Sequence, residues 1–210
     1  MTARRRRLGY GLRRVRLVLV AAAVVGALAV IDRWGLFGSR PLPDPEKYHG
    51  RSFRVVHVVD GDTIDLDAPD RDGRPTRVRL WGVDTPETVK PDTPPQHFGP
   101  EASEFTERVA AGRTVRTELV SSSTRDKYER LLAYVFLPDG RMLNSLLVAE
   151  GYGYADPRYD HPLAGQFRKL QSDAQAAGRG LWRDVRQEDL PYYYKSLKLP
   201  QTRPERSPDR

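Results

Sequence analysis

The sequence predicts an α+β protein, mainly β, in which five strands close into a small barrel accompanied by three helices. Three observations support this prediction. Residues 52–83 hold three successive runs rich in β-branched residues, separated by short turn sequences. Two more strand-like runs follow at 114–120 and 131–137, and three segments with helical periodicity are interleaved with or follow them. A meander start with five short strands is typical of a closed barrel of the OB type.

The strand runs have clear ends. "SFRVVHVV" (52–59) stops at "DG", a dipeptide that favours tight reversal, and "TIDLD" (63–67) alternates apolar with polar residues. "APDRDGRP" forms a turn before "TRVRLWGV" (76–83), the third strand. "TVRTELV" (114–120) and "LLAYVFL" (131–137) complete the set, the last one ending in "PDG".

Each helical segment carries a recognisable boundary. "PEASEFTERVAAG" begins with Pro100, which suits a first helical position, and stops at Gly112. "MLNSLLVAEG" stops in the same way at Gly151. "LAGQFRKLQSDAQAAG" repeats apolar residues at helical spacing, which places Phe167 and Leu170 on one face.

Composition limits the classes of protein to consider. A chain of 210 residues with 39% hydrophobic content suits one folded domain with appendages. There are no cysteines, which excludes disulfides, cysteine-rich zinc sites and cysteine nucleophiles. The net charge is +7, and seven arginines among the first 16 residues account for all of it. Any attraction of the folded domain for phosphate must therefore come from local charge.

The N-terminus predicts a targeting segment. After the arginines come fifteen uncharged residues, "LVLVAAAVVGALAVI" (17–31). A helix of that length covers roughly 22 Å, less than the ~30 Å hydrocarbon core of a bilayer. Trp34 suits an interfacial anchor, while "ALA" (27–29) offers a signal-peptidase pattern, so cleavage stays open. The arginines should remain cytoplasmic and the rest should be exported, as a single-pass bacterial membrane protein or, after cleavage, a secreted one.

We divide the chain accordingly. Residues 1–34 form the basic and hydrophobic targeting segment, and the proline-rich residues 35–49 form a linker. The folded domain covers residues 50–190, and the charged, proline-rich residues 191–210 are predicted to be a disordered tail.

Two acids that flank the hairpin of the second and third predicted strands (63–67 and 76–83) predict a cation site. Residues paired across this hairpin should have numbers that sum to about 142–146 if the register is regular. Asp62 then lies opposite residues 80–84, so Asp62 and Asp84 meet at one end of the barrel. Two adjacent carboxylates repel, and a hard divalent cation bound by carboxylate and backbone oxygens relieves that repulsion. The alternative is a pair of solvated acids at the barrel rim.

Two arginines flank these acids in the sequence. Arg79 precedes the "WGVDTPE" turn, and Arg130 precedes the apolar run at 131–137. Each arginine alone is typical of a solvated side chain. Together with a metal site, guanidinium groups suit binding of a phosphate diester and stabilisation of the negative charge in its transition state.

Five motifs carry a resemblance to a known family. "VVDGDTIDL", "RVRLWGVDTPE", "FGPEASEFTERV", "DKYERLLAYVF" and "AQAAGRGLW" occur in the order and spacing typical of the staphylococcal nuclease (thermonuclease) family. The resemblance extends over residues 52–184. It implies an OB-type barrel with three helices, in agreement with the strand and helix patterns above.

The resemblance implies a calcium site. By position in the motifs, the carboxylates of Asp62 and Asp84 and the backbone carbonyl of Thr85 would ligate Ca²⁺. Asp60 would lie behind these ligands and support them.

The resemblance also implies catalytic and substrate-binding roles. Glu87 matches the general base or water-positioning residue, and Arg79 and Arg130 match the arginines that contact the phosphate and its transition state. Lys127 and Tyr128 match positions that bind the terminal phosphate and sugar of the nucleotide.

A calcium-dependent, exported endonuclease is therefore predicted. It would hydrolyse phosphodiester bonds of DNA and RNA to give 3′-phosphates, as a monomer with no protein partner and with a membrane contact through its N-terminal helix. The alternative is a non-catalytic OB-fold module that binds nucleic acid or protein. The presence of a complete catalytic set favours the enzyme.

Three features depart from the family pattern. Glu129 stands where the family often has glycine, and an acid beside Arg130 would weaken substrate attraction unless its side chain faces solvent. Tyr154 and Tyr159 are candidates for nucleotide stacking, with core packing as the alternative. "PYYYKSLK" (191–198) could stack bases or dock the C-terminus onto the barrel.

Overall fold

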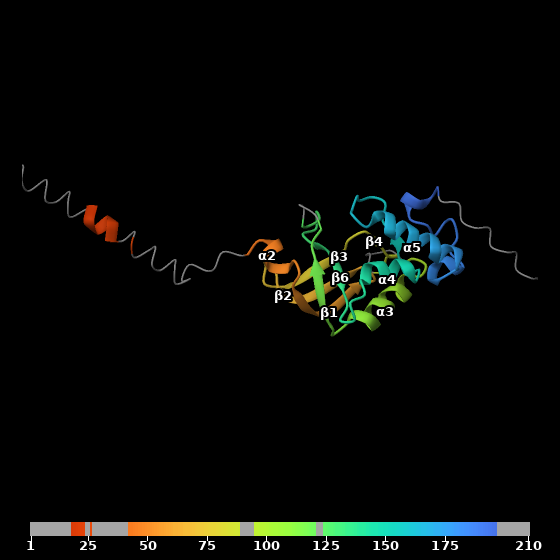
Figure 1. Ribbon diagram of the computed structural model, residues 1–210, viewed down its shortest axis with the longest axis horizontal. Coiled ribbons are helices and arrows are strands. Elements are labelled where there is room, and N and C mark those ends of the chain that lie inside the picture. Colours follow the sequence, from red (N-terminus) through yellow and green to blue (C-terminus); the bar gives the residue numbers. More distant parts are fainter. Residues whose placement is uncertain (1–17, 24–25, 27–41, 89–94, 121–123, 197–210) are drawn as a thin grey trace, which may run out of the picture. The chain divides into compact units, whose positions relative to one another are not determined.

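Five strands close into a barrel in the order β1-β2-β3-β6-β5 in the computed structural model (Figure 1). The strands are β1 (Ser52–Asp60), β2 (Thr63–Pro69), β3 (Pro75–Leu80), β5 (Thr114–Glu118) and β6 (Leu131–Phe136). Neighbours pair antiparallel except β3 and β6, which are parallel. The predicted five-stranded OB-type barrel, mainly β, is confirmed.

The structure describes residues 18–23, 26, 42–88, 95–120 and 124–196. The chain divides into two units, Met1–Leu42 and Pro43–Arg210, and the barrel belongs to the second. The helices of this unit are α2 (Asp44–Tyr48), α3 (Gly99–Ala110), α4 (Leu143–Ala149) and α5 (Ala164–Ala176), with 3₁₀ turns η1 (Gly180–Arg183) and η2 (Tyr192–Tyr194). The predicted three helices correspond to α3, α4 and α5. Helix α3 packs against β1, α4 against β6, and α5 against α4 (Figure 1).

The register of the β2–β3 hairpin agrees with the prediction. Thr63 pairs with Arg79 and Asp65 with Arg77, so the paired numbers sum to 142. The amide of Leu80 donates a hydrogen bond of 2.9 Å to the carbonyl of Asp62. This register places Asp62 at the end of the barrel where β3 finishes.

The predicted third strand (76–83) is interrupted in the structure. β3 ends at Leu80, and Gly82 turns the chain at φ 77°, in the left-handed region that favours glycine. A Cβ at this position would lie 2.5 Å from the ring of His161. The chain then enters β4 (Val83–Asp84), which pairs with β7 (Tyr154–Ala155) in a separate ribbon. The turn at Gly82 thus directs Asp84 back towards Asp62.

Apolar side chains from every strand fill the barrel. Val55, Ile64, Leu66, Val78 and Leu131 are all fully buried. Arg79 follows Val78 on β3, and Arg130 precedes Leu131 of β6. Because neighbouring side chains on a strand point to opposite faces, packing of the apolar residues fixes where these arginines can lie.

The prediction that residues 35–49 form a linker is wrong for its last part. Residues 44–48 form α2, and Tyr48 is fully buried, with its hydroxyl 2.8 Å from Thr76 Oγ1. The proline-rich sequence hides this helix, although proline is well tolerated in a first helical turn. The folded unit therefore begins at Pro43 rather than at Gly50, while residues 35–41 lie outside the described residues.

The prediction that residues 191–210 form a disordered tail is wrong for its first part. Residues 191–196 are described and include η2, and the Tyr194 hydroxyl donates a hydrogen bond of 2.5 Å to the carbonyl of Ala155. Docking of this segment, the second of the two alternatives for "PYYYKSLK", is confirmed for these residues. Residues 197–210 lie outside the described part of the chain.

The predicted membrane segment is described only in part. Residues 18–23 and 26 are helical, and the remainder of 17–31 lies outside the described residues. Within the part of the chain that the structure describes, no helix is both long enough and apolar enough to cross a bilayer.

Tyr48 provides a test of the revised domain boundary. Tyr48→Ala should lower the free energy of unfolding by ~3–5 kcal/mol, because it removes a fully buried aromatic ring. Tyr192→Ala is the matched control, since that ring is 74% exposed, and it should change stability by less than ~0.5 kcal/mol. Urea denaturation of both full-length variants measures the difference, and equal stabilities would mean that α2 is not part of the folded unit.

Candidate active site

Polar side chains gather in an open cleft of about 960 Å³ at the end of the barrel where β3 finishes. All nine predicted site residues line this cleft: Asp60, Asp62, Arg79, Asp84, Thr85, Glu87, Lys127, Tyr128 and Arg130. They come from the end of β1 and the β1–β2 turn, the end of β3, β4 and the chain after it, and the loop before β6. The structure brings these residues together, and their individual roles stay predictions.

Arg79 joins the two acids of the predicted cation site. Its Nη1 forms an ion pair with Asp62 Oδ2, and its Nη2 donates a hydrogen bond to Asp84 Oδ1. Asp62 Oδ2 also accepts a hydrogen bond of 2.8 Å from the backbone amide of Thr85. The Arg79 side chain is only 12% exposed, so this bridge lies largely out of contact with water.

Burial and Arg79 act on Asp84 in opposite directions. Burial raises the pKa of Asp84, because a charged carboxylate loses hydration, and the neighbouring Asp62 acts in the same direction. Arg79 opposes both effects. Burial alone would lower the pKa of Arg79, but the attraction of Asp62 and Asp84 raises it, so the guanidinium stays charged.

The oxygen donors at this point suit a hard cation. Asp62 and Asp84 provide carboxylate oxygens, and Thr85 follows directly with its backbone carbonyl. Thr85 Oγ1 is buried and makes no hydrogen bond within the described residues. Among those same residues, no three His, Asp or Glu side chains converge as a metal site. A cation bound here would thus complete its shell with backbone oxygens and water, as Ca²⁺ commonly does.

A second acidic pair lies beside the first. Asp60 Oδ1 accepts hydrogen bonds from the amide of Gly61 (2.8 Å), from Thr88 Oγ1 (2.7 Å) and from Ser103 Oγ on α3 (2.9 Å). Burial raises the pKa of Asp60, and so does its hydrogen bond with Glu87. Asp60 thus lies in hydrogen-bond contact with Glu87 and is tied to α3 through Ser103.

Arg130 is oriented by the loop that carries it. Its Nε and Nη2 both lie 2.7 Å from Asp126 Oδ2, and its backbone amide donates to Asp126 Oδ1 at 3.0 Å. Tyr128 is 67% exposed, with Lys127 Nζ 4.9 Å and the Arg130 guanidinium 5.4 Å from its ring centre. The loop thus presents two cations and one open aromatic face to the cleft.

The Glu129 side chain faces solvent and does not line the cleft. Its backbone has φ 62°, the left-handed conformation for which glycine is favoured. Its side chain is 72% exposed and pairs with Arg71 Nη1 at 3.2 Å. The alternative that Glu129 faces solvent is confirmed.

The sequence reasoning missed two residues that contact Asp84. Arg158 Nη2 lies 2.9 Å from Asp84 Oδ1 and 2.7 Å from Asp156 Oδ2. The Tyr193 hydroxyl donates to Asp84 Oδ2, and the Arg158 guanidinium lies 4.5 Å from the centre of the Tyr193 ring. Both residues are more than 70 positions from Asp84 in sequence. The spacing of the predicted motifs does not indicate either contact. The β4–β7 pairing brings Arg158 near Asp84, and the docked C-terminal segment brings Tyr193 there.

The two candidate stacking tyrosines have different environments. Tyr154 is 3% exposed and packs edge-on against Trp182, which is the core role given as the alternative. Tyr159 lines the cleft, is 48% exposed and has its ring centre 4.9 Å from that of Trp81. Only Tyr159 therefore offers a ring to a ligand.

The barrel and its cleft together define an OB-type protein with a polar cleft in which a buried arginine bridges two acids. A family model for staphylococcal nuclease homologues matches residues 77–184. The chain is 37% identical to a thermonuclease of Staphylococcus hyicus over 169 residues, which cover 79% of this chain and 94% of that protein. It is 40% identical to a thermonuclease of Staphylococcus intermedius over 170 residues, with the same coverage of 79% and 94%. An uncharacterized endonuclease of Escherichia coli O157:H7 is 34% identical over 138 residues, covering 65% of this chain and 78% of that protein. The chain belongs to the staphylococcal nuclease family.

The buried bridge predicts a large effect of Arg79 on the metal-free protein. Arg79→Met should lower the free energy of unfolding by ~3 kcal/mol in the presence of a chelator, because two buried acids lose their cation. Arg77→Met is the matched control: Arg77 also pairs with an acid, Asp65, but is 49% exposed, so the loss should stay below ~1 kcal/mol. Urea denaturation measures both, and a loss below ~1 kcal/mol for Arg79→Met would contradict the bridge.

Proposed function

We propose that this protein is a calcium-dependent endonuclease that hydrolyses phosphodiester bonds of DNA and RNA and leaves 3′-phosphates. The observation that supports it most is the sharing of one buried guanidinium, Arg79, by Asp62 and Asp84 in a cleft that also holds Glu87 and Arg130. Relatives named thermonuclease and endonuclease agree with this proposal.

The acids of the bridge would hold the metal. Asp62 and Asp84 would bind Ca²⁺ through their carboxylates and Thr85 through its carbonyl, and Asp60 would support them from behind. When bound, the ion supplies positive charge that polarises a phosphoryl oxygen. Arg79 is then no longer needed to neutralise the acids, so its guanidinium is available to bind a phosphate oxygen.

The remaining residues would act on water and phosphate. Glu87 orients the attacking water and accepts its proton, while Asp60 keeps the Glu87 carboxylate in place. The water oxygen forms a bond to phosphorus as the bond from phosphorus to the 5′ oxygen breaks, and a proton is transferred to that oxygen. Arg79 and Arg130 stabilise the extra negative charge of the transition state. Lys127 and Tyr128 would bind the terminal phosphate and the sugar.

A non-catalytic OB module is the alternative function, in which the protein binds nucleic acid or another protein. Such a module has no use for a carboxylate pair that positions a water-activating Glu87, nor for a buried pair of acids that requires a cation. The enzyme therefore accounts for more of the cleft than the binding module does. We further propose that the protein acts as a monomer.

Metal dependence is the first test. The full-length protein should degrade single-stranded DNA and RNA with calcium, and excess chelator should abolish the activity. Asp62→Asn should weaken calcium binding at least ~10-fold, because it removes one charged ligand, and added calcium should restore part of the rate. Calorimetric calcium titration and a nuclease assay check both points. Undiminished cleavage in chelator would remove the metal, and the proposed roles of Asp62 and Asp84, from the mechanism.

Chemistry and binding are separated by two further variants. Glu87→Gln keeps the size but loses the charge that orients water, so kcat should fall by ~10² or more. Arg130→Lys keeps the charge but loses the planar fork, and we expect a comparable loss. KM should change much less for both, since these groups act mainly in the transition state. Steady-state kinetics on a labelled oligonucleotide test this, and near wild-type kcat for both variants would place the active site elsewhere.

Export is a proposal that rests on the N-terminal sequence. The arginine cluster before residues 17–31 favours a cytoplasmic N-terminus and a nuclease domain outside the cytoplasm. In a bacterial host, protease added to spheroplasts should therefore remove the domain from the membrane fraction, or the domain should appear in the medium if the segment is cleaved. A domain protected in intact spheroplasts and degraded only after lysis would show that this topology is wrong.

A further inference from the structure

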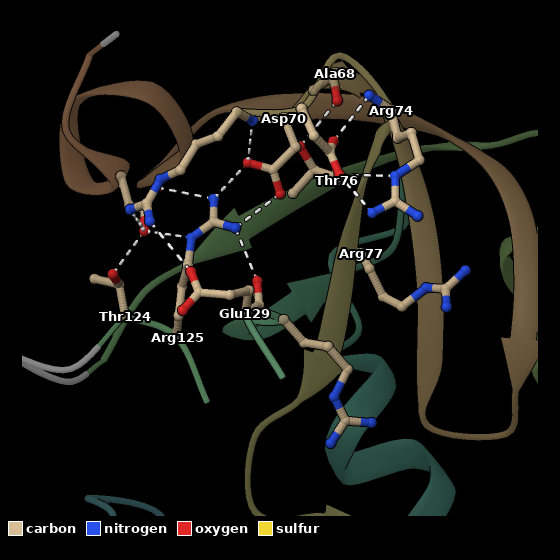
Figure 2. A network of polar contacts seen from close by, with 12 residues as sticks. Ala68, Asp70, Arg74, Thr76, Arg77, Thr124, Arg125 and Glu129 are labelled. Atoms are coloured by element: carbon tan, nitrogen blue, oxygen red, sulfur yellow. Dashed lines mark hydrogen bonds and ion pairs between the residues drawn. The ribbon is translucent and has the colours of Figure 1, made fainter. Parts of the chain in front are cut away.

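One buried guanidinium ties the loop that carries Arg130 to the rest of the barrel. Arg125 donates to Asp44 on α2, with Nε–Oδ2 2.7 Å and Nη2–Oδ1 3.0 Å. It also donates to Asp70 in the β2–β3 turn, with Nη1–Oδ2 2.7 Å and Nη2–Oδ1 2.9 Å. Figure 2 shows Arg125 between these two elements, and its side chain is only 8% exposed. Three segments far apart in sequence thus meet at one side chain.

Arg125 uses its full capacity to donate hydrogen bonds. Beyond the four bonds to the two acids, its Nη1 donates to the carbonyl of Glu129 at 2.8 Å. A guanidinium has five N–H groups, so each has an acceptor here. Lysine has a single ammonium group and cannot hold two carboxylates in this planar arrangement.

Both acids of this cluster stay charged at neutral pH. Burial is the largest single effect and would raise the pKa of Asp44 and that of Asp70. The hydrogen bonds and positive charge of Arg125, together with smaller contributions from other neighbours, lower both pKa values. Thr124 adds a hydrogen bond of 2.8 Å to Asp44. Two ionised carboxylates therefore hold Arg125 from opposite elements, and the start of the loop cannot shift without breaking charged hydrogen bonds.

The loop transmits this anchoring to the cleft. Asp126 follows Arg125 directly, and its carboxylate receives the side chain of Arg130 at 2.7 Å. Its backbone amide also donates to the carbonyl of Arg130 at 3.0 Å. The carbonyl that Arg125 grips belongs to Glu129, the residue in the left-handed conformation just before Arg130. Arg125 thus holds the loop on both sides of Lys127 and Tyr128.

We propose that Arg125, clamped by Asp44 and Asp70, is a positioning residue that aims the Arg130 guanidinium at the substrate phosphate. This inference rests on the proposed function of Arg130 in phosphodiester hydrolysis. It assigns a role in the active site to α2, which precedes the residues 77–184 matched by the family model. Displacement of a phosphate-binding group by about 1 Å is enough to cost on the order of 10²-fold in rate.

The test compares two Arg→Lys variants of the full-length protein. Arg125→Lys should lower kcat ~10- to 100-fold, because the loosened loop no longer holds the Arg130 guanidinium in position. KM should change by less than ~3-fold, because the loop keeps its positive charges. Arg141→Lys is the matched control: Arg141 also grips an aspartate, Asp139, through Nε (2.9 Å) and Nη2 (2.7 Å), but on an exposed turn. The control should keep wild-type kcat.

A double variant distinguishes positioning from general destabilisation. In an Arg130→Lys background, Arg125→Lys should lower kcat by less than ~2-fold, because the group that it positions is already lost. Val148→Ala is the control for stability: it removes buried apolar atoms from α4 and leaves the loop intact. Assayed well below its unfolding temperature, this variant should keep the wild-type kcat. Unchanged kcat in Arg125→Lys, or an equal loss with and without Arg130, would overturn the proposal.

Hydrogen exchange tests the clamp without relying on catalysis. The amides of Tyr128, Glu129 and Arg130 bond to Asp126, and they should exchange at least ~10-fold faster in Arg125→Lys, whereas amides in α4 should not change. Unchanged exchange in the loop would overturn the clamp. A wild-type protein without nuclease activity would overturn the proposed function instead, and the exchange rates would still decide whether Arg125 orders the loop.

Discussion

The contact of one buried guanidinium with two carboxylates is the constraint on which the active site depends. Asp62 and Asp84 come from two ends of a hairpin, and their side chains would repel each other without Arg79 between them. The hairpin register and the turn at Gly82 bring these acids together. Arg79 supplies the positive charge that these two largely buried carboxylates share. Under the proposed function, a metal ion bound by the two acids would take over this role from Arg79.

Further hydrogen bonds hold the other charged side chains of the cleft in place around this bridge. Asp60 is fixed by α3 and by the Glu87 carboxyl that it faces, so the acid proposed to orient water has a defined neighbour. Arg130 is held by Asp126, and the loop of both residues is held by Arg125 (Figure 2). Arg79, Glu87 and Arg130 therefore each contact an acid that further hydrogen bonds hold in place. Such preorganisation lowers the cost of placing water and phosphate for reaction.

Local sequence patterns were enough to predict the barrel and the meeting of Asp62 with Asp84, because hairpin register follows from turn position and a period of two. Long-range contacts were beyond such patterns. The contact of Tyr193 with Asp84 depends on how the C-terminus docks, and proline-rich composition hid α2 although Tyr48 is buried in the core. The backbone of Glu129 is another such case. Its carbonyl accepts a hydrogen bond from Arg125 and its amide donates one to the carbonyl of Asp126, and these bonds hold a conformation that glutamate rarely adopts.

The most direct measurement of the central claim is a crystal structure of the protein grown with saturating calcium. The account predicts a calcium ion about 2.3–2.6 Å from a carboxylate oxygen of Asp62 and from one of Asp84. Arg79 should no longer bridge the two acids and should turn towards the open cleft. An Arg79 bridge that persists at saturating calcium, with no ion bound between the acids, would contradict it.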